Sequence, residues 1–172
     1  MLVLPLLLAS APLLSPARAA PPSDGPAAAS RIHGGDHLVK GDGSFTIFEG
    51  EGLLSLSASY EYVLEQSPVG LGGQVRFLGG GGASVLGLGP RATYWFAGND
   101  SLTPYAGGSL TLWLGDAPDL LSLGGHGGIA LWMSETSAID LGGRLDLLIA
   151  DGEVYPQIVV AAGVLGVGRK RG

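Results

Sequence analysis

The sequence predicts an all-β fold, an antiparallel up-and-down β-barrel of eight strands. The first observation is that from Leu121 to Ile149 one of the two alternating sets of positions holds aliphatic residues and a few glycines, while the other is mostly small or polar, apart from a short turn at 134–137. This period places alternate side chains on opposite faces of a sheet. The second is that the same alternation returns along the chain with turn residues between the segments, which is typical of a meander. The third is the absence of cysteine, so no disulfide framework is expected.

The N-terminal part is expected to lie outside the barrel. Residues 1–19 are typical of a signal peptide, because the apolar run 2–14 is followed by Ala17-Arg18-Ala19, a small-x-small cleavage pattern. Residues 20–43 are rich in Pro, Ala, Gly and Ser and are expected to form a flexible tail. His33, Asp36 and His37 within it lack the further ligands of a metal site, so no metal and no cofactor are expected.

The barrel is expected to occupy residues 44–168, followed by a basic C-terminal tail at 169–172. Gly, Pro, Asn, Asp and Ser between the alternating segments supply the turns. The longest late apolar run, 158–168, falls short of the roughly 20 residues that a membrane helix needs but suits a tilted strand. The expected strands are 44–48, which is the weakest, 53–64, 69–78, 84–97, 102–114, 122–133, 138–150 and 154–168.

Composition indicates which face of the barrel meets water. Only 14% of the residues are charged and the mean hydropathy is +0.36, whereas a soluble domain carries roughly a quarter charged residues. The polar face consists mostly of Gly, Ser and Thr, which suits a crowded interior better than a soluble surface. We therefore expect the aliphatic face to contact lipid and the polar face to line the lumen, as in a transmembrane barrel.

Charged residues at the inward-facing positions of the strands are expected to close this lumen. An eight-stranded barrel is just wide enough for side chains to fill it, and unpaired charges inside would be very unfavourable. Arg144 stands between Asp140 and Asp146 on one strand and is expected to pair with both. The full set of polar residues assigned to the lumen is Glu61, Arg76, Arg91, His126, Asp140, Arg144 and Asp146.

Four aromatic residues occupy outward-facing positions near the ends of strands. They are Tyr60, Tyr62, Tyr94 and Phe96. Tyrosine rings are enriched where a membrane meets water, and barrels carry aromatic girdles at that level. We expect these side chains to lie at one membrane interface.

Two stretches are similar to a known family. Residues 89–96 form a strand that ends in aromatic residues, and after a short turn 102–108 begins with Leu102-Thr103-Pro104-Tyr105. Together with the hairpin 124–146, they resemble the small eight-stranded outer-membrane barrels of the OmpA and OmpX type. The resemblance implies an outer-membrane location. The chain departs from the family in ending on a basic tetrapeptide instead of an aromatic residue, and in the short loops expected to face outward.

These observations lead to a non-enzymatic outer-membrane barrel with a structural or envelope-interaction role and a lumen plugged by side chains. Its partners are expected to be outer-membrane lipid and an envelope component of unknown identity. A net charge of −6 argues against nucleic acid. Two alternatives remain: a secreted lipocalin-like barrel that binds an apolar ligand, and a lipid-modifying barrel enzyme using His126.

Overall fold

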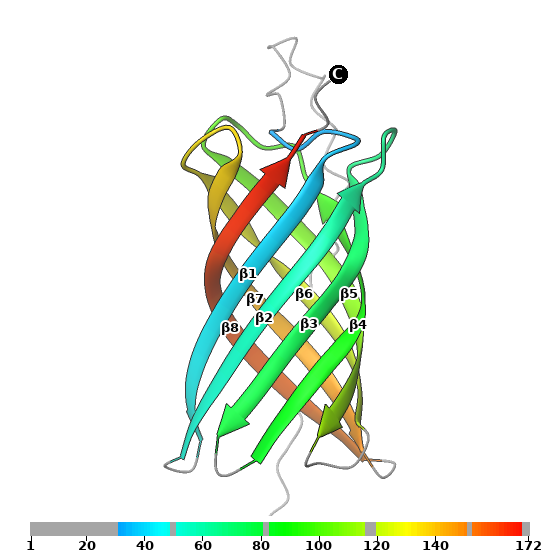
Figure 1. Ribbon diagram of the computed structural model, residues 1–172, viewed down its shortest axis with the longest axis vertical. Helices are drawn as coiled ribbons and strands as arrows, with labels where there is room; N and C mark the ends of the chain where they lie inside the picture. Colours follow the sequence, from blue (N-terminus) through cyan, green and yellow to red (C-terminus); the bar gives the residue numbers. More distant parts are fainter. Residues whose placement is uncertain (1–30, 49–50, 81–82, 116–119, 151–152, 170–172) are drawn as a thin grey trace, which may run out of the picture.

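The computed structural model describes residues 31–48, 51–80, 83–115, 120–150 and 153–169. They form one closed antiparallel barrel in which each strand pairs with its neighbours in sequence and β1 pairs with β8 (Figure 1). The described residues contain no helix long and apolar enough to cross a membrane. The strands are β1 (His37–Phe48), β2 (Glu51–Val63), β3 (Val69–Gly80), β4 (Ala83–Trp95), β5 (Leu102–Gly115), β6 (Leu120–Trp132), β7 (Ser137–Ala150) and β8 (Glu153–Gly168).

The predicted fold class and strand number are confirmed, but the predicted start of the barrel is wrong. β1 begins at His37, inside the segment 20–43 that was expected to be a flexible tail, and its residues 37–43 pair with both β2 and β8. Lys40 and Asp42 face inward here, while Gly41 and Gly43 occupy outward positions and supply no aliphatic side chains. The expected signal peptide, most of the tail and residues 170–172 lie outside the described residues.

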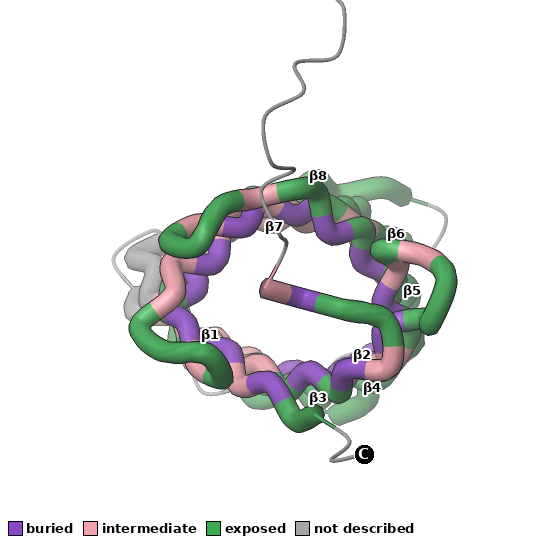
Figure 2. The backbone as a smooth tube through the Cα atoms, turned by 90° about the horizontal axis from the view of Figure 1, so that it is seen from above, coloured by how far each residue is buried: buried purple, intermediate pink, exposed green. Residues whose placement is uncertain are grey.

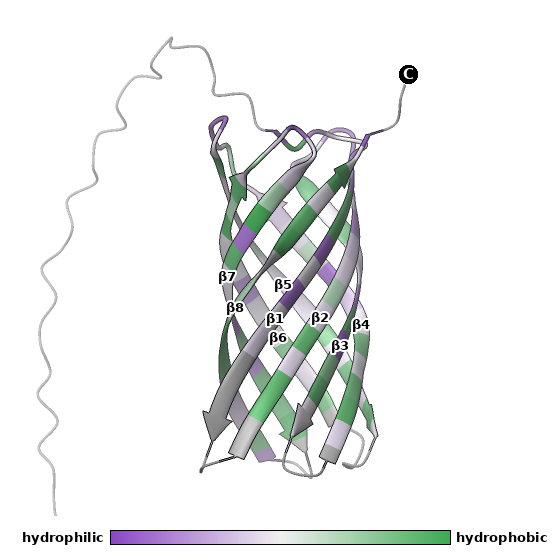
Figure 3. Ribbon diagram, turned by 60° about the vertical axis from the view of Figure 1, so that its left-hand side comes forward, coloured by the Kyte–Doolittle hydropathy of each residue, from purple (hydrophilic) through white to green (hydrophobic). Residues whose placement is uncertain are grey.

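The alternation along each strand separates an apolar outside from a polar inside. Large hydrophobic residues are exposed on every strand, among them Leu56, Leu88, Leu112 and Leu145. Figure 3 shows these hydrophobic positions alternating with polar ones along the strands. Most residues between them are buried or partly buried, and Figure 2 shows buried segments alternating with exposed ones along the barrel wall.

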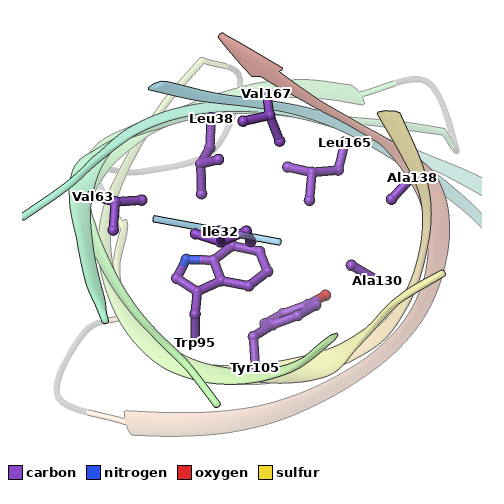
Figure 4. Close-up of a cluster of buried hydrophobic side chains, with 9 residues drawn as sticks. All are labelled: Ile32, Leu38, Val63, Trp95, Tyr105, Ala130, Ala138, Leu165 and Val167. Atoms are coloured by element: carbon purple, nitrogen blue, oxygen red, sulfur yellow. The ribbon is translucent and has the colours of Figure 1, made fainter. Parts of the chain in front are cut away.

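The two ends of the barrel differ. The near end is where β1 begins, β8 ends and the turns 64–68, 96–101 and 133–136 lie, and the far end is where β1, β3, β5 and β7 end (Figure 1). A cluster of buried hydrophobic side chains fills the near end, with Ile32, Trp95 and Tyr105 at its middle (Figure 4). Its other members come from five strands: Leu38, Val63, Ala130, Ala138, Leu165 and Val167.

Ile32 precedes β1 and reaches into the barrel from the near end. The segment 31–36 crosses the opening in Figure 2. Gly35 adopts a φ of +88°, which favours glycine, and its N–H donates to the carbonyl of Val63 at 2.8 Å. The chain thereby folds back from the lumen into the first strand, and Ile32 closes this end.

Candidate functional site

The lumen holds the polar residues assigned to it from the sequence, in three connected groups. In the first, the Arg91 guanidinium on β4 lies 2.6 Å from the Glu61 carboxylate on β2, and both side chains are buried. The Thr93 hydroxyl donates to the same carboxylate at 3.0 Å. Arg91 also donates to Ser59 at 3.2 Å. The ion pair therefore ties β2 to β4 across the strand that separates them.

His126 belongs to this first group. Its Nε2 lies 2.9 Å from Nη2 of Arg91 and 3.0 Å from the Thr93 hydroxyl. Because a guanidinium can only donate, Nε2 of His126 accepts this hydrogen bond and the imidazole is neutral. The ring also packs 6.3 Å from the Tyr105 ring, measured between centroids.

The second group joins β1 to β5 and β7. The Lys40 ammonium lies 2.6 Å from the Asp140 carboxylate and donates to the Tyr105 hydroxyl at 2.8 Å. Asp42, also on β1, accepts from the Ser57 hydroxyl at 2.6 Å. Sequence reasoning missed Lys40 and Asp42 because it assigned them to the tail.

The third group lies further toward the far end and is built around Asp146. Its buried carboxylate accepts hydrogen bonds from Arg76 on β3 and from Arg144 on β7, each at 2.8 Å. The Arg76 guanidinium also lies 4.6 Å from the centroid of the Trp113 ring, and Trp113 donates to the Ser122 hydroxyl at 3.1 Å. Arg76 and Asp146 are 70 residues apart in the chain, and their pair joins β3 to β7.

The expectation that Arg144 pairs with both neighbouring aspartates is wrong in part. Arg144 pairs with Asp146, whereas the ion pair of Asp140 is made by Lys40. The position of Asp140 and Arg144 on the same strand does not decide the ion-pair partner of Asp140. Lys40 reaches Asp140 from β1, which pairs with β8 where the barrel closes.

Charges inside the described lumen balance. Acidic residues are Asp42, Glu61, Asp140 and Asp146, and basic residues are Lys40, Arg76, Arg91 and Arg144. The space left between the three groups is about 20 Å³, close to the room needed by one water molecule. The network therefore fills the middle of the barrel.

Inward glycines make room for the large lumen side chains. A Cβ at Gly107 would lie 2.6 Å from Nε2 of His126, and one at Gly142 would lie 2.6 Å from the Tyr105 hydroxyl. Real Cβ atoms do not approach so closely, so side chains at these positions would displace the ring groups. Glycine at these two inward positions therefore leaves room for His126 and Tyr105 in the narrow lumen.

Polar contacts at the near end hold the segment 31–36 in place. Arg31 donates to the Ser134 carbonyl at 3.1 Å and its guanidinium lies 6.0 Å from the centroid of the Trp132 ring. Arg169, just beyond β8, donates to the Arg31 carbonyl at 3.0 Å and lies 3.8 Å from Asp36. His33, Asp36 and His37, considered for metal binding, form no group of metal-ligand character within the part of the chain that the structure describes.

The four aromatic residues assigned to an interface point outward at the near end. Tyr94 and Phe96 pack edge to face with centroids 4.9 Å apart. His37 contacts the rings of Tyr60 and Tyr62 at 5.9 and 5.3 Å. The hydroxyl of Tyr60 is 2.5 Å from Nδ1 of His37. These rings therefore lie on the outside of the barrel, on or directly after β2 and β4.

Comparison with known proteins identifies the fold. No protein-family profile matches the chain, and no curated protein sequence matches it. Among solved structures, the crystal structure of Neisserial surface protein A aligns with a TM-score of 0.55 and 16% identity, covering 76% of this chain and 95% of that one. OprG, an outer-membrane protein of Pseudomonas aeruginosa, aligns with a TM-score of 0.52 and 13% identity over 81% and 99%.

A de novo designed transmembrane β-barrel aligns with a TM-score of 0.50 and 14% identity, covering 80% of this chain and 98% of that one. The chain therefore has the fold of the small eight-stranded outer-membrane barrels, as its resemblance to the OmpA and OmpX type implied.

Proposed function

We propose that this chain is a non-enzymatic outer-membrane barrel protein with a structural or envelope-interaction role, exported by its signal peptide. The observation that carries the proposal is the separation of an aliphatic outside from a charged, hydrogen-bonded inside around the barrel. In lipid, a closed barrel satisfies the backbone polar groups of its strands between neighbours. Aliphatic side chains on its outside then meet hydrocarbon.

A soluble ligand-binding barrel reverses this arrangement. Soluble monomers rarely expose contiguous apolar patches larger than a few hundred Å², whereas Leu56, Leu88, Leu112 and Leu145 are exposed on four different strands here. An apolar ligand would also have to displace the ion pairs that fill the middle of the lumen. Both points favour the membrane barrel over the lipocalin-like alternative.

The partners of His126 favour a structural role over lipid-modifying chemistry. Nε2, the unprotonated nitrogen that could act as a base in this tautomer, accepts a hydrogen bond from Arg91 inside the lumen. A base must reach the proton that it abstracts, and an acyl chain in the bilayer lies on the other side of the barrel wall. His126 instead helps to position Arg91 and Thr93.

A closed lumen supports a role other than general diffusion. The three ion-pair groups span the lumen, and Ile32 with its hydrophobic cluster closes the near end. Planar-bilayer recording of the purified full chain is expected to show no steady open channel. A large, constant conductance would make the protein a small porin.

Cell fractionation tests the location. The full chain is expected in the outer-membrane fraction, and its mobility on a detergent gel is expected to change with boiling, because a folded barrel resists the detergent at room temperature. Leu112→Arg, which places a charge on the outer face, provides the matched control and is expected to reduce the folded band. Recovery as a soluble periplasmic or secreted protein would refute the proposal.

A further inference from the structure

The seam between β1 and β8 is paired along only part of its length. The ladder runs from His37 opposite Gly168 to Gly43 opposite Ala162. β1 continues to Phe48 and β8 begins at Glu153, yet in the described residues this ladder does not extend along 44–48. β1 remains paired with β2, and β8 with β7, through the same region. In Figure 1 the lower ends of β1 and β8 lie on opposite sides of the barrel outline.

Side-chain exposure on β8 marks the same opening. Ile158 and Val160 are 78% and 79% exposed, whereas Leu112 and Leu145, on fully flanked strands, are 46% and 48% exposed. Ile158 and Val160 point outward beside the unpaired stretch of β1, so they lack the flanking cover that the other outward residues receive.

A cavity of about 370 Å³ lies at this opening. Its volume falls in the range of roughly 300 to 1,000 Å³ that is usual for small-molecule sites. The inward residues that line it come from β1, β2, β3 and β8 and are all uncharged: Ser44, Leu53, Ser55, Leu78, Gln157 and Val159. Ile158 and Pro156 border it on β8. The cavity wall therefore combines apolar side chains with two serine hydroxyls and one glutamine amide.

The cavity ends toward the middle of the lumen. Gln157, one of its lining residues, lies opposite Asp146 in the β7–β8 ladder, and Asp146 is bound by Arg76 and Arg144. The third ion-pair group thus stands between the cavity and the rest of the lumen. Between the described strands, access is left through the open seam.

The unpaired backbone N–H and C=O groups along this seam need polar surroundings. Unpaired strand edges are not tolerated in hydrocarbon unless they line a water-filled cavity or are covered by protein. The uncharged polar side chains of the cavity and the free backbone edges can together solvate a small polar head group. The exposed Ile158 and Val160 give an attached alkyl chain an apolar path into the surrounding lipid.

We propose that the β1–β8 seam is a lateral binding site for a single-chain amphiphile with an uncharged polar head, such as a monoacylglycerol. The head group hydrogen-bonds inside the cavity to Ser55 and Gln157, and the chain leaves between β1 and β8. The lining residues that the structure describes include no cation that could pair with an anionic head. A strand from a second copy would pair with the seam but would leave the interior cavity empty, which disfavours that occupant.

The absence of cysteine makes a disulfide test possible. Ser44 and Ala161 each lie one residue beyond the last ladder pair, so oxidation of Ser44→Cys with Ala161→Cys draws the two strands together at the paired end of the open seam. Gly43→Cys with Ala162→Cys is the matched control, because these residues already face each other in the ladder. Each variant is reconstituted as full chain in phosphatidylcholine vesicles containing a doxyl-labelled monoacylglycerol, and electron paramagnetic resonance measures the motionally restricted probe.

The unmodified protein is expected to show more restricted monoacylglycerol than restricted phosphatidylcholine probe. Oxidised S44C/A161C is expected to lose this excess and to regain it on reduction, while oxidised G43C/A162C keeps it. Val159→Trp, which fills the cavity, is expected to lose the excess, and Val164→Trp on the outer face is expected to keep it. An equal restricted fraction in the open and closed forms would overturn the proposal, as would disulfide-linked dimers of S44C/A161C, which indicate that a second copy covers the seam.

This inference rests on the proposed membrane location. Heat-dependent mobility of every variant is therefore measured first, so that loss of the folded membrane barrel and loss of amphiphile binding are separate results.

Discussion

Removing the cation of the Glu61–Arg91 pair tests the lumen network most directly. Arg91→Met keeps an unbranched apolar side chain in the lumen but removes the guanidinium that lies 2.6 Å from the Glu61 carboxylate. Thr93 would then be the remaining polar partner recorded for this carboxylate. Breaking a buried ion pair from one side costs about 3 to 5 kcal/mol, because the other charge is left uncompensated.

Urea unfolding from lipid vesicles, followed by tryptophan fluorescence, measures this loss. For a denaturant slope of about 2 kcal/mol per M, a loss of about 4 kcal/mol lowers the midpoint by about 2 M. Arg169→Met is the matched control. Its guanidinium lies 3.8 Å from Asp36 at the barrel end and is partly exposed, so a change of only about 0 to 1 kcal/mol is expected.

A second substitution separates the stranded charge from lost packing. Glu61→Gln combined with Arg91→Met removes the carboxylate as well and is expected to recover much of the stability. Arg144→Met is expected to cost less than Arg91→Met, because Asp146 keeps Arg76. Equal losses for Arg91→Met and Arg169→Met, or no recovery in the double variant, would refute the idea that buried charge governs the stability of the lumen.

Three further outcomes are expected. Leu112→Arg should cost about 2 to 4 kcal/mol near the bilayer midplane in vesicle refolding, while Leu64→Arg, beside a turn, should cost about 0 to 1 kcal/mol; similar costs would contradict the assigned membrane-facing surface. His126→Ala should leave lipid A acylation unchanged in mass spectra of cells expressing either form, and an altered acylation pattern would instead support the enzyme alternative. Gly107→Val should lower the thermal midpoint because its Cβ would lie 2.6 Å from the His126 ring, and an unchanged midpoint would show that the ring has room to move.

The faces of the strands could be predicted from the sequence, since a period of two needs only local information. Glu61, Arg76, Arg91 and Asp146 all lie inward where their parity placed them. Ion-pair partners across the lumen were not predictable in the same way. Alternation indicates that a side chain faces inward, but it does not indicate which strand lies opposite that side chain. The pairing of Lys40 with Asp140 depends on how β1 meets β8.

The start of β1 was missed for a related reason. Outward Gly41 and Gly43 remove the aliphatic half of the pattern, and Gly, Asp and Lys are depleted in strands. Pairing with β2 and β8 overrides this weak local preference. Ile32 carried no usable signal either, since a single aliphatic residue in a polar segment does not indicate that it enters a barrel.

The partly paired seam also bears on how the barrel assembles and opens. All other strand pairs join neighbours in sequence, so they can form as successive hairpins with small loop-closure cost. β1 and β8 meet only after nearly the whole chain has been ordered, and their ladder is the short one. Amide hydrogens of β8 residues 157–161 that point toward β1 should therefore exchange with solvent first, and those of the β5–β6 hairpin last.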